Sequence, residues 1–130
     1  MVDINSFKIT PVQGQVDLQF AGSVISARVK SDEVTALIAG QPIKLVDSAG
    51  GVPEVTALTA NTQQAFGFVT RNLKDQDYPA YSSVEIALQG TVVWMTAGAA
   101  IARGAKLEVV YTTNKVITNA GTNPVCGYAY

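Results

Sequence analysis

The stretch ISARVK, residues 25–30, alternates apolar and polar side chains along its whole length. Its apolar members, Ile25, Ala27 and Val29, fall on one face of an extended chain, and its polar members fall on the other. This period of two predicts a half-buried β-strand. The same alternation recurs in FKIT (7–10), VDLQF (16–20) and VEIALQ (84–89). TVVWM (91–95) and KLEVVY (106–111) are richer in β-branched and aromatic residues, as strands buried on both faces tend to be.

Glycine and proline separate these segments at the spacing of about 8–12 residues that is typical of sandwiches and barrels. The sequence therefore predicts an all-β fold, a small antiparallel β-barrel or sandwich. One segment, SDEVTALIA (31–39), favours a helix of about two turns with Ser31 as its N-cap. The segment AGAAIARG (97–104) is bounded by Gly98 and Gly104 and is expected to be a loop.

An internal repeat organises the chain beyond residue 36. IAGQPIKLV (38–46) leads through a turn to AFGFV (65–69), and IARGAKLEVV (101–110) leads through a turn to VCGYAY (125–130). Gly40 aligns with Gly104 and Gly67 with Gly127, which predicts a duplicated hairpin unit. We expect one compact domain, with an N-terminal arm and lead-in strands in 1–35 and the main β-domain in 36–130. Residues 1–20 are either an extended arm that pairs outside its own barrel or an ordinary edge strand.

Composition narrows the function. The chain has 130 residues, of which 48% are hydrophobic and 15% charged, against about 25% charged in an ordinary domain. We therefore expect part of the surface to be covered by other copies or by a partner. The net charge is −1, with the basic residues scattered, which argues against nucleic acid as a partner. The first residues lack the basic start of a signal peptide, and no stretch is long and apolar enough for a membrane helix.

Catalysis is not expected. The chain has no histidine and one cysteine, Cys126, so histidine-based catalysis and most zinc sites are excluded. Cys126 is expected to be a small buried hydrophobic residue. Asp75 and Asp77 are more typical of a solvated loop than of a catalytic pair. We expect no cofactor, no metal and no small-molecule substrate.

The residues expected to contact partners are mainly aromatic. Tyr78 and Tyr81 flank Pro79 in a predicted loop, an arrangement typical of contact hot spots. Trp94 is either a core residue or an interface residue. Tyr128 and Tyr130 are expected to be tied into the sheet or docked on a neighbour. The arm contributes the remaining candidates: Phe7, Ile9, Val16, Leu18 and Phe20.

The order of several segments carries a family resemblance. YPAYSSVEIALQGTVVWMTAGAAIARGAKLEVV (78–110), preceded by AGQPIKLV and AFGFV and followed by NPVCGYAY, resembles the capsid cement or head decoration proteins of tailed bacteriophages. The resemblance covers roughly residues 36–130. It implies a β-rich, commonly trimeric protein that is made in the host cytoplasm and bound to the outer surface of the expanded capsid.

The resemblance also implies the partners. They are the major capsid protein and further copies of the chain, with the N-terminal region as the capsid-contacting arm and the Tyr78–Tyr81 loop as a second contact. No catalytic residue is implied. The alternatives are another virion β-module, such as a tail-tube or head-completion subunit, and a carbohydrate-binding or hydrolytic β-domain.

Overall fold

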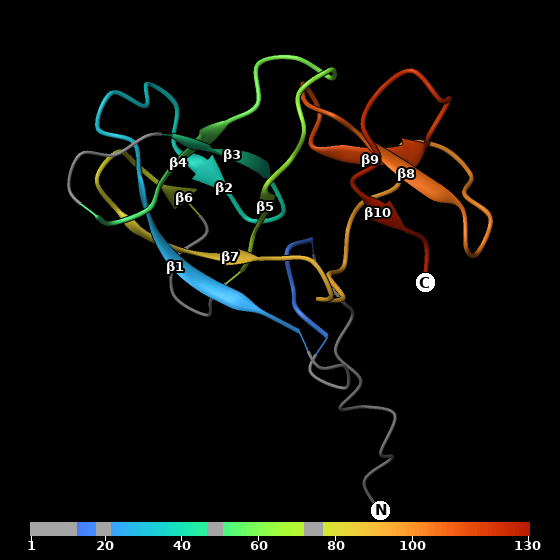
Figure 1. Ribbon diagram of the computed structural model, residues 1–130, viewed down its shortest axis with the longest axis horizontal. Helices are drawn as coiled ribbons and strands as arrows, with labels where there is room; N and C mark the ends of the chain where they lie inside the picture. Colours follow the sequence, from blue (N-terminus) through green and yellow to red (C-terminus); the bar gives the residue numbers. More distant parts are fainter. Residues whose placement is uncertain (1–12, 18–21, 47–50, 72–76) are drawn as a thin grey trace, which may run out of the picture.

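The computed structural model describes residues 13–17, 22–46, 51–71 and 77–130. Within these ranges the protein is all-β, as the sequence predicts, and it contains no helix. Five strands close a barrel in the order β1-β4-β3-β5-β7, and a three-stranded sheet, β10-β8-β9, lies beside it (Figure 1). A small sheet pairs β2 with β6. The strands are β1 (Val24–Val29), β2 (Leu37–Ile38), β3 (Pro42–Val46), β4 (Glu54–Ala57), β5 (Gly67–Val69), β6 (Asp77–Tyr78), β7 (Ser83–Ala87), β8 (Lys106–Val110), β9 (Lys115–Thr118) and β10 (Gly127–Tyr128).

The two alternating segments form the longest pairing of the barrel. β1 and β7 run antiparallel, with Ile25 opposite Ile86 and Ala27 opposite Val84. All four of these side chains point inward, and Val84 and Ile86 are buried. Because side chains alternate between the two faces of a strand, the polar partners are left on the outer surface. β1, which falls in the predicted lead-in segment 1–35, is therefore a strand of the barrel.

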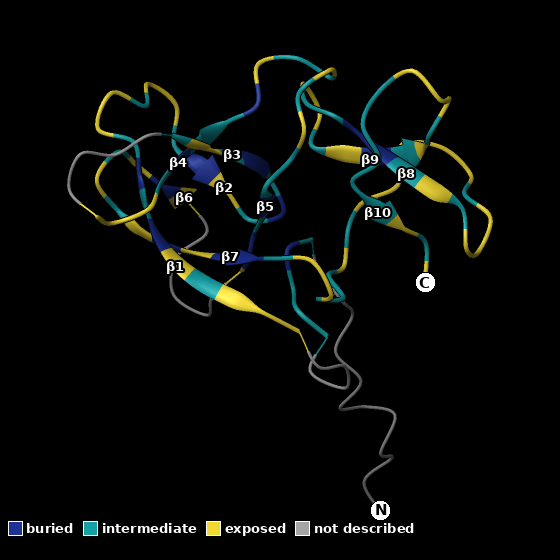
Figure 2. Ribbon diagram, viewed as in Figure 1, coloured by how far each residue is buried: buried dark blue, intermediate teal, exposed yellow. Residues whose placement is uncertain are grey.

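Two apolar clusters hold the fold together (Figure 2). The first fills the barrel with β-branched and leucine side chains, and Leu37, Ile43 and Ile86 are fully buried. The second joins the barrel to the three-stranded sheet, because Leu58 and Phe68 pack against Val109 and Val116. Each fully buried aliphatic side chain contributes about 1.5–3 kcal/mol through burial.

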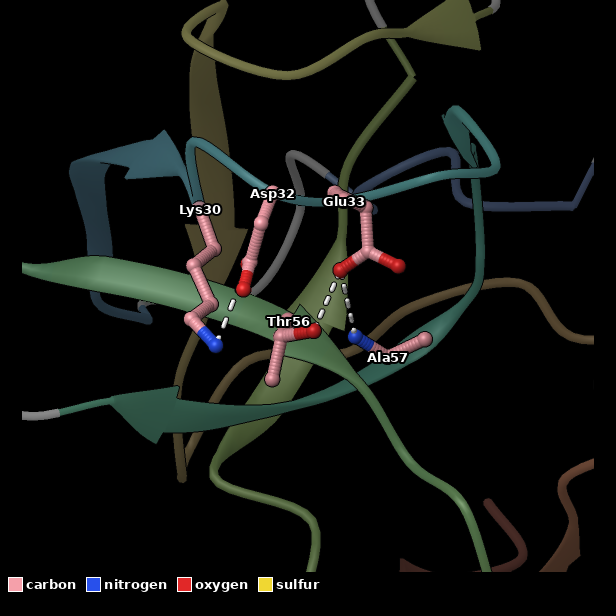
Figure 3. A network of polar contacts seen from close by, with 5 residues as sticks. All are labelled: Lys30, Asp32, Glu33, Thr56 and Ala57. Atoms are coloured by element: carbon pink, nitrogen blue, oxygen red, sulfur yellow. Dashed lines mark hydrogen bonds and ion pairs between the residues drawn. The ribbon is translucent and has the colours of Figure 1, made fainter.

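The predicted helix at 31–39 is wrong. The chain turns at Lys30–Glu33, where the Glu33 amide donates to the Lys30 carbonyl. It then enters β2, where Leu37 pairs with Tyr78. Figure 3 shows the reason: the Glu33 carboxylate reaches across to β4 and accepts hydrogen bonds from the Thr56 hydroxyl and the Ala57 amide. Tertiary contacts of this kind outweigh a weak helix propensity. The loop predicted at 97–104 is confirmed, since no helix forms there.

The segments expected to be buried on both faces behave differently. In β8 the adjacent residues Glu108 and Val109 face opposite sides and are both buried, as predicted. In TVVWM only Val93 makes a bridge, to Val16 of the same chain. Trp94 is 46% exposed, which excludes the core, one of the two alternatives left open for it. Within the described residues, the backbone of Trp94 pairs only with Gly14 and Gln15, and not with a long strand. One face of the Trp94 side chain is therefore left open to solvent.

The internal repeat is present in three dimensions. In the first repeat, residues 38–69, β3 lies between β4 and β5; in the second repeat, residues 101–130, β8 lies between β9 and β10. Ile43 stands opposite Gly67, and Leu107 stands opposite Gly127. The opening glycines match as well. Gly40 donates to the Val69 carbonyl at 2.7 Å and Gly104 donates to the Ala129 carbonyl at 2.8 Å, both from the left-handed conformation at φ 82° that glycine adopts without strain.

Candidate interaction surface

Large apolar side chains are exposed over several parts of the described chain. All exposed residues, polar and apolar, are yellow in Figure 2. Apolar side chains that stand singly on a surface are ordinary, whereas aromatic residues grouped with arginine are enriched at protein interfaces. The exposed group comprises Val24, Val34, Ile38, Leu45, Val52, Tyr81, Trp94, Tyr128 and Tyr130.

The turn before β7 holds Tyr81 in an unusual conformation. The Ser82 amide donates to the Pro79 carbonyl, which closes a turn over residues 79–82, and the Tyr81 amide donates to the Val29 carbonyl at 3.0 Å. Tyr81 has φ 66° and a side chain that is 67% exposed. A left-handed conformation costs a bulky L-residue about 1–2 kcal/mol. Burial of the ring does not offset this cost, because the ring faces solvent. An unfavourable backbone conformation at an exposed side chain is typical of functional positions.

Tyr81 borders an open hollow on the outer face of β1 and β7. The floor consists of small side chains, because Ser26 points outward from β1 and Ser83 points outward from β7, where it pairs with Arg28. Tyr81 and Val52, both exposed, also line it. They come from the segments before β7 and β4, the two neighbours of β1 in the barrel. The hollow is therefore an open depression on the sheet, lined by apolar, hydroxyl and guanidinium groups.

An ion pair lies at the side of the hollow. The Arg28 guanidinium binds the Glu54 carboxylate at 2.7 Å, across the parallel β1–β4 pairing. The Arg28 side chain is 39% exposed and the Glu54 side chain 15%. The pair fixes the guanidinium beside the hollow and offsets its charge. A partner would thus meet mainly apolar and hydroxyl groups together with a planar guanidinium.

A second aromatic group lies at the end of the chain. Tyr128 is 66% exposed and Tyr130 is 75% exposed. The Arg103 guanidinium lies over the Tyr130 ring, 6.0 Å from its centroid, at the outer limit of a cation–π contact. Tyr128 belongs to β10 and Tyr130 follows it. The pairing of β10 with β8 ties this end of the chain into the sheet, which is one of the two expected alternatives.

The structure separates the predicted contact residues. Pro79 and Tyr81 are exposed. Tyr78 is 3% exposed, in the core, where its hydroxyl donates to the Thr70 carbonyl; its assignment as a contact residue is wrong. Its alternation with Asp77 in β6 turns the ring inward against Leu37. Val16 is half-buried. Phe7, Ile9, Leu18, Phe20 and Asp75 lie outside the described residues.

Of the residues that line the hollow, sequence reasoning named only Tyr81 as a contact and missed Val52 and Arg28 among others. Val52 follows a glycine in a segment that carries no alternation, so no local signal marks it. Arg28 is part of the alternating β1 segment, and its outward direction was predictable. Its pairing with Glu54 was not, because a parallel pairing between segments about 26 residues apart leaves no local signature.

The thiol of Cys126 lies partly buried in the second repeat. The pKa of the Cys126 thiol is raised from 9.0 to about 11, mainly by burial and further by the nearby Glu108 charge, against a backbone hydrogen bond that lowers it. Cys126 packs partly buried against the second cluster, in keeping with a small hydrophobic residue. Among the residues that the structure describes, no three His, Cys, Asp or Glu side chains gather to hold a metal.

The described elements include no helix of the length and apolar character needed to cross a membrane. Comparison of the chain with protein-family models, with curated proteins and with solved structures finds no match.

Proposed function

We propose that this chain is a structural capsid cement protein of a tailed bacteriophage, which binds the outer surface of the expanded head and bridges neighbouring capsomers. The observation that carries the proposal is the exposed Tyr81 ring beside the Val52 and Arg28 hollow. It gives a rigid barrel a mainly uncharged contact face. Two further observations support it: several segments follow one another in the same order as in head decoration proteins, and the fraction of charged residues is low.

The contact works by shape and multiplicity. A protein that binds the assembled shell but not its loosened state stabilises the shell in proportion to RT ln(1 + [L]/Kd). Tyrosine and arginine are suited to such a face, because both are enriched at contact hot spots and an aromatic ring brings much contact area at low entropic cost. Several weak contacts suffice. A trimer that holds several capsomers at once makes each later contact intramolecular, which raises overall affinity by about 10²- to 10⁴-fold.

The closed barrel suits a mechanical role. Five strands joined edge to edge deform little under load, since every inner strand shares backbone hydrogen bonds on both sides. We infer that the barrel transmits tension between capsomers that internal pressure would separate. The partners are the major capsid protein and further copies of this chain, and the site of action is the outside of the virion.

The deciding experiment compares heads assembled with and without the chain. Heads lacking it should lose DNA at lower temperature and after milder osmotic shock, and purified chain added back should restore resistance. Electron-microscopic reconstruction should place the added density on the outer shell and not in the tail, which separates cement from a tail-tube or head-completion subunit. Heads equally resistant without the chain would rule the proposal out.

A further inference from the structure

The structural repeat extends beyond the two hairpin units. In the barrel, β1 lies parallel to β4, with Val29 opposite Val55 and the Lys30 amide donating to the Val55 carbonyl at 3.0 Å. Beside β9, Ala97 lies parallel to Val116, and the Gly98 amide donates to the Val116 carbonyl at 2.8 Å. The segment 96–98 thus takes the place of β1. Four successive positions of the barrel have a counterpart around the second repeat.

The fifth position has no counterpart among the described residues. In the barrel, β7 closes the sheet by pairing with β5 on one side and β1 on the other. In the second repeat, β10 takes the place of β5, and no strand of the described ranges lies beyond it. Phe68 of β5 is half-buried, whereas its counterpart Tyr128 is 66% exposed. Among the described residues, the second repeat is therefore an open barrel without a closing strand.

The surroundings of the two equivalent glycines, Gly67 and Gly127, differ in the same way. A Cβ added at Gly67 would lie 2.5 Å from the Ala87 carbonyl oxygen, because β7 passes directly over it. A Cβ added at Gly127 would meet nothing within 4 Å. Gly127 therefore leaves open space at the position where, in the first repeat, β7 passes close to the backbone of Gly67.

The edge of β10 offers backbone groups for pairing. The Ala129 amide donates to the Ala105 carbonyl and the Ala129 carbonyl accepts from the Gly104 amide, so both groups point toward the side of β8. Backbone groups alternate in direction along a strand, so the amide and carbonyl of Tyr128 point away from β8. An exposed edge of this kind is a template for an added strand.

We propose that this edge accepts residues 6–10 of a second copy, which complete the second repeat as β7 completes the first. The β7 sequence is SVEIA, and residues 6–10 read SFKIT. Both begin with serine, place apolar side chains at the second and fourth positions around a charged one, and end with a small residue. Phe7 and Ile9 would then face the second repeat, as Val84 and Ile86 face the barrel core.

The net charges of the two parts of the chain favour association between copies. Residues 96–130 carry three basic side chains and one acidic side chain, a net charge of +2, and the whole chain has −1, so residues 1–95 carry −3. The second repeat of one copy thus attracts the remainder of the next. Donor and acceptor are different surfaces, so the contact is head-to-tail and closes into a ring when the rotation permits. The inference does not depend on binding to a capsid.

The test measures the oligomeric state of the purified full chain by sedimentation equilibrium. The wild type should associate. Gly127→Ala on the acceptor side and Phe7→Ser with Ile9→Ser on the donor side should each weaken association by at least about tenfold. The control, Lys8→Ser with Thr10→Ser, alters the same segment on its other face and should associate as the wild type does. Circular dichroism should give each variant the wild-type β content.

A mixture identifies the exchange directly. The acceptor variant still carries an intact donor strand and the donor variant an intact edge, so mixing them should give 1:1 dimers and nothing larger. A wild type that remains monomeric at about 100 μM would overturn the proposal, as would an assembly that neither variant weakens. Should Gly127→Ala fail to fold, the donor variant and its control still decide the outcome.

Discussion

A Cβ on Gly67 would stand 2.5 Å from the carbonyl oxygen of Ala87, the residue at which β7 crosses it. The side chain of Ile86 comes equally close, at 2.6 Å. Close approach of two backbones therefore fixes glycine at this position of the first repeat. The equivalent Gly127 of the second repeat is free of this constraint in the isolated chain.

The two glycines should respond differently to the same substitution. Gly67→Ala forces β5 and β7 apart and should lower the free energy of unfolding by about 2–4 kcal/mol. Gly127→Ala, in open space, should change it by less than about 1 kcal/mol. Urea unfolding of the two variants provides the comparison, each variant serving as the other's control. Equal destabilisation would contradict the closing role of β7.

Tyr81→Gly should separate stability from binding. Glycine relieves the left-handed backbone at Tyr81, so thermal unfolding should show equal stability or a gain of up to about 1 kcal/mol. Loss of the exposed ring should weaken binding to expanded heads by about tenfold or more. Val34→Ala, which removes a side chain that is 97% exposed in another turn, is the matched control. Undiminished binding by Tyr81→Gly would exclude the hollow as the contact.

Glu108→Ala should destabilise the second repeat. The carboxylate is 5% exposed and accepts hydrogen bonds from the side-chain amides of Asn119 and Asn123 and the backbone amide of Ala120. Its removal leaves these donors without their acceptor, which should cost about 2–4 kcal/mol in denaturant unfolding. Glu85→Ala on the exposed face of β7 should stay within about 0.5 kcal/mol of the wild type. A small effect at Glu108 would mean that water replaces the carboxylate.

Cys126 should react slowly with alkylating reagents. The pKa of its thiol is raised to about 11, so at pH 8 the thiolate fraction is about 10⁻³. Alkylation by iodoacetamide should be at least about 100-fold slower than that of an unfolded control in urea, and its rate should climb until about pH 11. The raised pKa favours the folded state fully below about pH 9, and this contribution is lost as the pH rises through 11. A rate that levels off near pH 9 would show that the thiol is solvated.

Local pattern was sufficient to predict the strands β1, β7 and β8 and the faces that β1 and β7 bury. Alternation in 25–30 and 84–89 placed Ala27, Val29 and Val84 inward, because the period of two holds for any extended chain. The repeat was readable for a similar reason. Matching glycines need matching backbone conformations, and Gly40 and Gly104 share φ 82°.

Tertiary structure decided which strands meet and which polar groups find partners. The parallel β1–β4 pairing joins distant segments and creates the hollow, and the reach of Glu33 to β4 replaces a helix with a turn. Tyr78 is buried because β6 pairs with β2. These outcomes depend on hydrogen bonds and packing between residues far apart in sequence, whose free energies exceed local propensities and leave no trace in any short stretch of the chain.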